Sequence, residues 1–389
     1  MEEKVTMAKR SITTDALHPA RLLVSAALSA AEFSKKFRPT ISNTPDLPKL
    51  NWDAIQQLPP QVLETPPQLP AARAVVITWA EPEWAAMEHV FCSSGASMPY
   101  SEQNKGSWSG WVKYIDGVPA ALAYWGYYRL VQIGTAKVLL FKSNTHYAAS
   151  EGEQNLEQLI KRLIQLVNPQ LLLSIGTAGG ARAADPIGTV NVVHSDALYE
   201  SNQPQNHWPR YSSPWAPAWT LMGALKSLLF PIPTTTADLN SIVSQFNQFY
   251  GSEYSLDTLN PDNLNMGAPT PAINDLTKPG TALVTAKSFV VGNTSGNLAD
   301  FACVEMDDAI VAKATAGKVA FGSIRNISDP IQNAALPELF QGHWGEAIYT
   351  AYGMYTSHNG AVAAWAVLSG QFAASAAKGM RARLRGRNQ

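Results

Sequence analysis

The sequence predicts an α/β fold, in which helices cover a twisted mixed sheet. Runs typical of buried strands, such as Arg73 to Trp79 and Leu171 to Ile175, alternate with stretches of helical spacing such as Leu156 to Val167. Glycines or acidic residues follow several of the strand-like runs. The ends of strands are where ligands usually bind in α/β proteins, so the pattern also predicts a ligand site at this edge of the sheet.

The composition fits a globular protein that binds neither nucleic acid nor a membrane. Its 389 residues are 46% hydrophobic, which is enough for one large core or two modest ones. With 29 basic and 30 acidic residues the net charge is −1, so no excess of positive charge indicates nucleic acid as a partner. The most apolar late segment, Gly360 to Ala377, contains two serines and a glutamine, and we interpret it as a buried helix.

The cysteines and histidines favour a reduced, cytoplasmic protein. Cys92 and Cys303 are too few for a disulfide framework or a structural zinc site. The seven histidines are scattered, without the paired spacing typical of zinc ligands. No secretory signal is evident, because the apolar run Leu22 to Ala31 is short and interrupted by serines. We therefore expect no metal and no cofactor.

The region 1–72 has the pattern of an appendage to the main domain. His18 to Phe37 has the spacing of an amphipathic helix, and prolines then recur between Pro39 and Pro70. This proline spacing favours an extended strap or linker over packed structure. The sequence does not show whether it acts as a dimer arm, a lid or a docking segment.

The main domain is expected to begin with the strand Arg73 to Trp79, followed by a helix. Pro82 suits a first helical position, and acidic residues beside it suit the N-terminus of a helix. Helix capping is therefore one interpretation of Glu81 and Glu83. A catalytic carboxylate at this junction is the other.

Three strands and a helix are expected before the central strand. The strands are Trp108 to Tyr114, Val118 to Tyr124 and Ala136 to Phe141, and the helix is Leu156 to Val167. The central strand is predicted to stop at the glycine-rich stretch Gly176 to Gly180, and a further strand, Thr189 to Ser195, follows. Glycines let backbone N–H groups approach a ligand closely, although such turns are also common for structural reasons alone.

The second half of the chain contains an insertion and then a second group of acidic residues. Residues 201–279 are rich in Trp and Pro, include a helix-like stretch, Ser241 to Tyr250, and are expected to form a cap or an oligomer contact. A helix over Ala309 to Gly317 and a strand over Val319 to Ile324 are predicted next. A helix-like segment, Gly353 to Leu368, precedes a basic tail, 371–389, that we expect to be solvated.

Five sequence motifs resemble those of the nucleoside phosphorylase and nucleosidase superfamily. They are GTAGG at 176–180 with GTVNVVHSDALY at 188–199, TAKSFVVGN at 285–293, VEMDD at 304–308 and IRNISD at 324–329. The chain looks most similar to the branch that hydrolyses 5′-methylthioadenosine and S-adenosylhomocysteine. This resemblance implies a three-layer α/β/α catalytic domain over 73–370, with an adenine-type nucleoside or nucleotide as substrate and a homodimer or higher homo-oligomer as the assembly.

Cleavage of an N-glycosidic bond defines the groups that such a site needs. Positive charge develops on the ribose and negative charge on the leaving purine. The enzyme needs an acid near purine N7, a group that holds the ribose hydroxyls and an activated nucleophile. Asp329 is the candidate acid, and the resemblance assigns activation of the water to Glu83, with Glu81 as the alternative. The candidate substrate-binding residues are Thr177, Gly179, Phe289, Val290, Glu305, Met306, Asp307, Arg325 and Ser328.

Some of these residues have a competing interpretation or depart from the family pattern. Phe289 is predicted to stack on the purine, or to be an ordinary core residue. The family normally has Glu where this chain has Asp307, which puts sugar specificity in doubt. The stretch that contains Lys142 and His146 replaces a glycine-rich turn. His146 either packs in the core or reaches a 5′-substituent, and with Lys142 and Arg182 it would contact the phosphates of a nucleotide substrate.

The sequence favours hydrolysis over phosphorolysis. Phosphate binding needs positive charge or forked donors. Phosphorylases of this superfamily have an Arg just before the central glycine motif, where this chain has Ser174, and another Arg in the early turn, where it has Glu81 and Glu83. The prediction is a purine nucleosidase that releases free base, without nucleic-acid or membrane partners. A phosphorylase and a non-catalytic nucleoside-binding homologue remain the alternatives.

Overall fold

The computed structural model describes most of the chain from Phe37 onward. The described residues are 37–100, 109–147, 149, 151–182, 184–193, 198–200, 210–211, 221–261, 266, 271–276, 283–286, 301–330, 336 and 338–385. The predicted helix that begins at His18 lies outside them, apart from Phe37. So does much of the predicted insertion.

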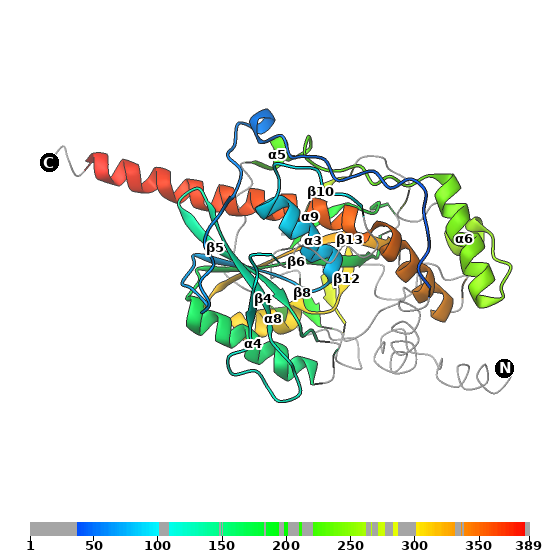
Figure 1. Cartoon of the computed structure of the whole chain (residues 1–389), viewed down its shortest axis with the longest axis horizontal. Helices are drawn as coiled ribbons and strands as arrows, with labels where there is room; N and C mark the ends of the chain where they lie inside the picture. Colours follow the sequence, from blue (N-terminus) through cyan, green and yellow to red (C-terminus); the bar gives the residue numbers. More distant parts are fainter. Residues whose placement is uncertain are drawn as a thin grey trace.

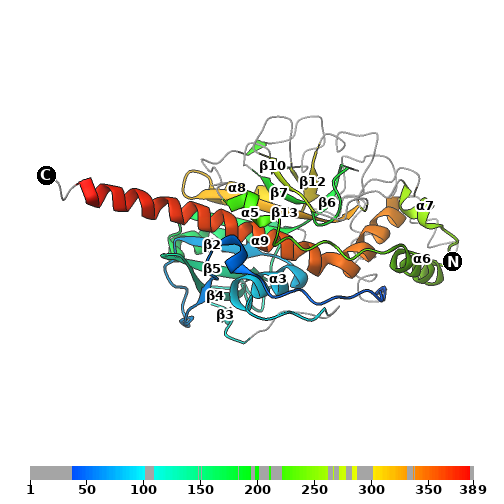
Figure 2. The same cartoon turned by 90° about the horizontal axis from the view of Figure 1, so that it is seen from above.

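One mixed sheet forms the centre of the molecule, and helices cover both of its faces, as Figures 1 and 2 show. The helices are η1 (Trp52–Ile55, 3₁₀), α3 (Glu81–Cys92), α4 (Gly152–Val167), α5 (Met222–Leu225), α6 (Thr236–Tyr250), α7 (Leu256–Leu259), α8 (Asp308–Thr315) and α9 (Glu338–Arg385). The strands are β1 (Gln61–Val62), β2 (Ala74–Thr78), β3 (Val112–Tyr114), β4 (Gly126–Ile133), β5 (Ala136–Ser143), β6 (Leu171–Gly180), β7 (Val190–Val193), β8 (Leu198–Glu200), β9 (Arg210–Tyr211), β10 (Ile273–Leu276), β11 (Leu283–Thr285), β12 (Cys303–Glu305) and β13 (Ala320–Pro330).

Two pairs of helices make the outer layers. Helices α3 and α9 pack together on one face, and α4 and α8 pack together on the other. Strand β6 lies in the middle, parallel to β2 on one side and to β13 on the other. The predicted α/β fold, with a mixed sheet between helical layers, is confirmed.

The alternation of side chains along β6 divides the core between the two faces. Leu172 belongs to the apolar cluster that contains α4, whereas Leu171, Leu173 and Ile175 belong to the cluster that contains α3 and the part of α9 from Ala361 onward. Successive side chains of a strand point to opposite faces, so one strand supplies both cores. The predicted helix Leu156 to Val167 is confirmed as the main part of α4, whose apolar stripe is buried.

The predicted meander is partly wrong. Val118 to Tyr124 is irregular, and the strand lies further along the chain as β4, which forms a hairpin with β5. The sequence GYYRLVQI of β4 is rich in the aromatic and β-branched residues that strands favour. Gly134, with φ of +56°, makes the tight turn to β5.

The prediction that the central strand stops at Gly176 is also wrong. Strand β6 continues to Gly180, because Gly176 to Ala178 stay paired with β13 and Gly179 and Gly180 then pair with both β12 and β13. Gly176 serves close packing and not a turn. A Cβ on Gly176 would lie 2.4 Å from the Arg325 guanidinium and 3.0 Å from a carboxyl oxygen of Glu83.

Strand β13 likewise runs past the predicted end at Ile324. It continues to Pro330, so Arg325, Ser328 and Asp329 lie within the strand. A shift of register between Ile327 and Asp329 marks a bulge in its pairing with β6. Bulges change the direction of side chains, and this one lies where Ser328 and Asp329 line a cavity.

The described part of the proline-rich strap, residues 37–72, is extended as predicted but packs against the main domain. Several of its apolar side chains, among them Phe37, Leu47 and Trp52, are buried, whereas Leu58 and Val62 are exposed. The Trp52 ring lies 4.4 Å from the Trp365 ring of α9, measured between centroids. Backbone groups of the strap accept hydrogen bonds from Tyr128 and Tyr355. Prolines prevent a helix or a central strand here, but they do not prevent burial.

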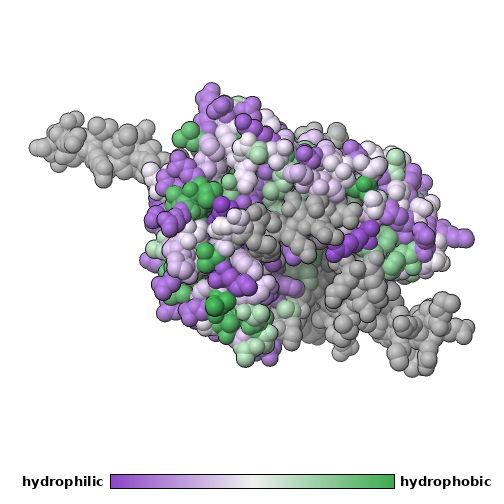
Figure 3. Space-filling model, viewed as in Figure 1, coloured by the Kyte–Doolittle hydropathy of each residue, from purple (hydrophilic) through white to green (hydrophobic). Residues whose placement is uncertain are grey.

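Helix α9 is longer than the predicted segment Gly353 to Leu368, and its C-terminal end projects past the other elements in both views (Figures 1 and 2). It continues through much of the predicted tail. None of the helices in the described part of the chain combines the length and apolarity needed to cross a membrane. Hydrophobic residues on the face in Figure 3 are divided among small patches between hydrophilic ones.

Candidate active site

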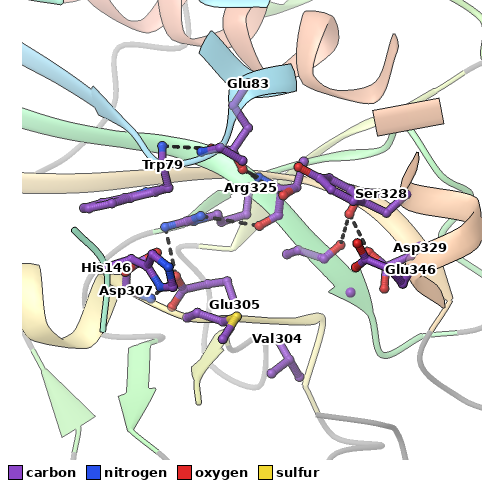
Figure 4. Close-up of a pocket in the computed structure, with 16 residues that line it drawn as sticks. Trp79, Glu83, His146, Val304, Glu305, Asp307, Arg325, Ser328, Asp329 and Glu346 are labelled. Carbon is purple, nitrogen blue, oxygen red and sulfur yellow. Dashed lines mark hydrogen bonds and ion pairs between the residues drawn. The ribbon is translucent and has the colours of Figure 1, made fainter. Parts of the chain in front are cut away.

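A cavity of about 330 Å³ opens where β6, β12 and β13 meet the N-terminal ends of α3 and α9, a volume typical of small-molecule sites. Figure 4 shows side chains from these elements pointing toward it. It is lined by Trp79, Ala80, Glu83, His146, Thr177, Ala178, Gly179, Val304, Glu305, Met306, Asp307, Arg325, Ser328, Asp329, Glu346 and Tyr349.

Glu83 reaches the cavity from the first turn of α3. Its Oε2 accepts hydrogen bonds from the Thr78 hydroxyl and the Trp79 and Ala80 N–H groups, at 2.8 to 2.9 Å. Its Oε1 accepts from the N–H and the hydroxyl of Thr177, at 2.7 and 2.8 Å. Glu83 therefore caps its own helix and lines the cavity, so the capping and catalytic interpretations are compatible. An ionised carboxylate only accepts hydrogen bonds, and these five donors fit that form.

A buried network of ions lies beneath the cavity. Arg325 on β13 makes a two-pronged ion pair with Asp308, at 2.6 and 2.8 Å, and contacts Glu305 at 2.8 Å. Burial alone would lower the pKa of Arg325, but Asp308 and Glu305 raise it. Burial raises the pKa of Glu305, and the negative charge of Asp308 raises it further. The positive charge of Arg325 thus neutralises part of the combined negative charge of Asp308 and Glu305.

Asp307 lines the cavity beside this network. Its Oδ1 accepts a hydrogen bond from the N–H of Tyr147, at 2.9 Å. Burial raises the pKa of Asp307, against the opposing effects of Arg325 and the Tyr147 N–H. The backbone N–H of Asp307 bonds Glu305 at 2.7 Å, which holds the turn from β12 into α8 in place.

Asp329 is the least compensated of the cavity's acidic groups. Its Oδ1 accepts a hydrogen bond from the Ser328 hydroxyl at 2.5 Å, whereas its Oδ2 is buried and has no hydrogen-bond partner. The residue is only 3% exposed. Burial raises the pKa of Asp329 to about 7, although the Ser328 hydroxyl opposes the shift. A carboxyl group with this pKa is partly protonated near neutral pH and is able to donate a proton.

His146 lines the cavity on the side of Asp307, as Figure 4 shows. Burial and the charge of Lys142 lower the pKa of His146. Lys142 and Arg182, the other two predicted 5′-group contacts, are not among the lining residues. The Lys142 ammonium donates to the Ser143 carbonyl at 2.6 Å, and burial lowers the pKa of Lys142.

Most of the predicted site residues from distant parts of the chain lie around this one cavity. The alternative to Glu83, Glu81, is exposed and does not line it. Phe289 and Val290 lie outside the described residues. The predicted residues that line the cavity are Glu83, His146, Thr177, Gly179, Glu305, Met306, Asp307, Arg325, Ser328 and Asp329.

Sequence reasoning missed several residues in or next to the cavity, and some of them bear on its chemistry. Trp79 follows the first strand, and its indole N–H bonds Ser174 at 3.2 Å. Asp308 stands in the quoted VEMDD motif but was not recognised as the partner of Arg325. Glu346 and Tyr349 come from α9, where their spacing of three residues places both on one helix face. This spacing of three residues can be read from the sequence, but the sequence does not show that this face of the helix points to the cavity.

Comparison with known proteins gives matches only among solved structures. No family model and no curated protein matches the chain. A 5′-methylthioadenosine/S-adenosylhomocysteine nucleosidase from Neisseria meningitidis, solved with methylthio-immucillin-A, is 13% identical, with 76% of this chain and 99% of that chain covered and a TM-score of 0.39. Futalosine hydrolase of Helicobacter pylori is 14% identical, with 76% and 97% covered and a TM-score of 0.41.

A third match is a putative 5′-methylthioadenosine/S-adenosylhomocysteine nucleosidase from Borrelia burgdorferi, bound to adenine. It is 13% identical, with 76% of this chain and 98% of that chain covered and a TM-score of 0.43. The solved structures that match this distantly include nucleosidases, the class that the sequence motifs resemble. At such low similarity, the chemistry of the chain has to be argued from its own cavity.

Proposed function

We propose that the protein is a purine nucleosidase that hydrolyses the N-glycosidic bond of an adenine-type nucleoside or nucleotide and releases the free base. The observation that carries the proposal is the position of Glu83, Asp307 and Asp329. These carboxylates come from separate parts of the chain and line one cavity. Their surroundings differ in the way that an acid, a base and a sugar-binding group require.

Asp329 serves as the acid that activates the leaving purine. As the bond between C1′ and N9 breaks, its electron pair moves onto the purine, and a proton on N7 neutralises the charge. The buried Oδ2, which has no partner, is where this proton would be held. The neighbouring hydroxyl of Ser328 fixes the other oxygen and therefore the direction of the group.

Glu83 serves as the base that receives a proton from the attacking water. The water oxygen forms a bond with C1′ of the positively charged sugar, and one water proton passes to the carboxylate. Five donors already occupy the lone pairs of Glu83. The Thr177 hydroxyl belongs to a cavity-lining residue, and its rotation away from Oε1 would free a lone pair of Glu83 for the water.

Asp307 serves to hold the ribose hydroxyls. One of its oxygens is fixed by Tyr147, which leaves the other for the sugar. Its side chain is one methylene shorter than the glutamate usual in the resembled family. The sugar therefore binds closer to β12, or through a water molecule.

The charges around the cavity favour water over phosphate as the nucleophile. Arg325 is the one guanidinium among the described lining residues, and it is engaged by Asp308 and Glu305. Ser174 bonds to Trp79 and Arg325, where a phosphorylase would have a second arginine. Phosphate next to these carboxylates would be repelled, whereas water is not.

The test is product analysis with and without inorganic phosphate. Purified protein is incubated with adenosine, methylthioadenosine, AMP and ATP, and the products are separated by chromatography. We expect free base and free sugar at a rate that phosphate does not change. Sugar 1-phosphate that forms only with phosphate would support the phosphorylase alternative. No base release from any substrate would support a non-catalytic nucleoside-binding protein.

A further inference from the structure

The segment of α9 that faces the cavity carries a carboxylate for which the proposed reaction has no use. Glu346 and Tyr349 are its two lining residues. In Figure 4 the Glu346 and Asp329 side chains lie toward the same end of the cavity, away from His146 and Asp307. Burial raises the pKa of the Tyr349 phenol, and the charges of Glu83, Glu346 and Asp329 raise it further, so all three carboxyls lie within electrostatic range of this hydroxyl.

Packing on both sides holds this segment of α9 in position. The Tyr349 phenol has a hydrogen-bonding interaction with the Thr177 side chain of β6. Its ring packs over Gly353, where a Cβ would lie 2.9 Å from the ring. On the other side the His343 ring stacks on Tyr250 of α6, with centroids 4.9 Å apart. Glu346 is therefore presented by a fixed helix and not by a loop, as a specificity group requires.

The chemistry of purines gives Glu346 a role in recognition of the base, an inference that rests on the proposed function. The N7 atom and the substituent on C6 share one edge of the purine. Adenine presents N7 as an acceptor and an amino group as a donor, whereas guanine and hypoxanthine present two acceptors. If Asp329 donates its proton to N7, a base whose C6 edge faces α9 brings the C6 substituent toward Glu346, which lines the same end of the cavity. The buried Oδ2 of Asp329, without a partner, marks the point where the edge would bind.

We propose that Glu346 is a specificity-determining residue that selects 6-aminopurines over 6-oxopurines. Its carboxylate accepts a hydrogen bond from the amino group of adenine. The same carboxylate opposes the oxygen of a 6-oxopurine, because two acceptors face each other without a proton between them. Asp329 then acts as the general acid, and Glu346 determines which purine base is accepted.

The test compares adenosine with inosine, which share the same sugar and differ at C6. The ratio of their kcat/KM values is measured for the natural protein and for Glu346→Gln. The glutamine amide has the same size but is able to accept or donate, so it tolerates both bases. We expect the natural protein to prefer adenosine by at least about tenfold, and the variant to lose most of that preference. A merely structural defect would lower both rates and leave their ratio unchanged.

Two further variants control for charge and for geometry. Glu157→Gln removes a carboxylate from the exposed side of α4, away from the cavity, and should leave the ratio unchanged. Glu346→Asp keeps the charge on a shorter side chain and should retain part of the preference. An adenosine to inosine ratio that is the same in the natural protein and in Glu346→Gln would overturn the proposal.

Calorimetric titration with adenine and with hypoxanthine separates this proposal from the proposed hydrolysis. Tighter binding of adenine that is lost in Glu346→Gln supports the specificity role, even if no nucleoside is cleaved. Equal binding of both bases by the natural protein refutes that role, even if adenosine is hydrolysed.

Discussion

Glu83 and Asp329 are chemically similar groups in the same cavity, yet the chain surrounds them in opposite ways. Glu83 accepts five hydrogen bonds, three of them from backbone N–H groups. Asp329 accepts one, from Ser328, and its second oxygen is buried without a partner. Donors stabilise the charged form of a carboxyl group, and burial without donors stabilises the neutral form. The difference shows how one fold is able to supply a base and an acid a short way apart.

The largest expected effect is on catalysis by Asp329→Asn. An asparagine at this position has nearly the same shape but has no acidic proton to give to N7. We expect base release to fall by about 10²- to 10⁴-fold, the usual contribution of general acid catalysis. The measurement is the steady-state rate with adenosine. An undiminished rate would remove Asp329 from the mechanism and with it the contrast between the two carboxyls.

The next effect concerns the dependence of stability on pH. In the folded protein the pKa of Asp329 is raised to about 7, from an ordinary value of 3.8. Its contribution to stability is therefore full at low pH and is lost as the pH rises through about 7. The expected slope is about 1.4 kcal/mol per pH unit between roughly pH 4 and 7. Urea unfolding of the natural protein and of Asp329→Asn at several pH values measures it, and the variant should lose this part of the slope.

The Glu83→Gln substitution should destabilise the folded protein. The amide replaces one acceptor oxygen by a donor, which leaves buried N–H groups of the Trp79 to Ala80 turn or of Thr177 unpaired. We expect the free energy of unfolding to fall by about 1–3 kcal/mol, the usual cost of an unsatisfied buried group. Chemical denaturation at pH 8 gives the value. The contrast between the two carboxyls would be contradicted if Glu83→Gln were as stable as the natural protein. It would also be contradicted if Asp329→Asn lost as much free energy of unfolding as Glu83→Gln.

The smallest expected effect is a shift in the pH profile of Ser328→Ala. The Ser328 hydroxyl stabilises the ionised form of Asp329 and lowers its pKa. Its removal should raise that pKa, so the alkaline fall in kcat/KM moves to higher pH, by less than about one unit. A shift to lower pH would mean that another group controls the alkaline limb.

The sequence allowed the fold and much of the site to be predicted because the signals are local. The strand Ala74–Thr78, the turn and the start of α3 follow one another within a few residues, and this local order places Glu83 correctly. The motif at β12 and the motif in β13 likewise place Asp307 and Asp329. Glu83 and Asp329 converge because β2 and β13 both run parallel to β6, which brings their ends to one edge of the sheet. Asp307 reaches the same edge from β12, which is antiparallel to β6 and pairs with Gly179 and Gly180.

The errors arose where tertiary contacts decide the outcome. A glycine-rich stretch after an apolar run predicts the end of a strand, but Gly176 lies within β6, where Arg325 and Glu83 leave no room for a side chain. Glu346 and Tyr349 lie in the long helix α9, and the packing of this helix on β6 and β13 turns them toward the cavity. The burial of the strap likewise depends on partners such as Trp365, which are distant in the sequence.

The most direct test of the proposed chemistry is a crystal structure with a purine C-nucleoside, whose bond between sugar and base is not hydrolysed. We predict that Oδ2 of Asp329 lies at hydrogen-bond distance from N7, about 2.6–3.2 Å. Asp307 should contact the ribose hydroxyls, and Glu83 should face the opposite side of C1′. A base bound away from Asp329, or a sugar that does not reach Asp307, would contradict the account.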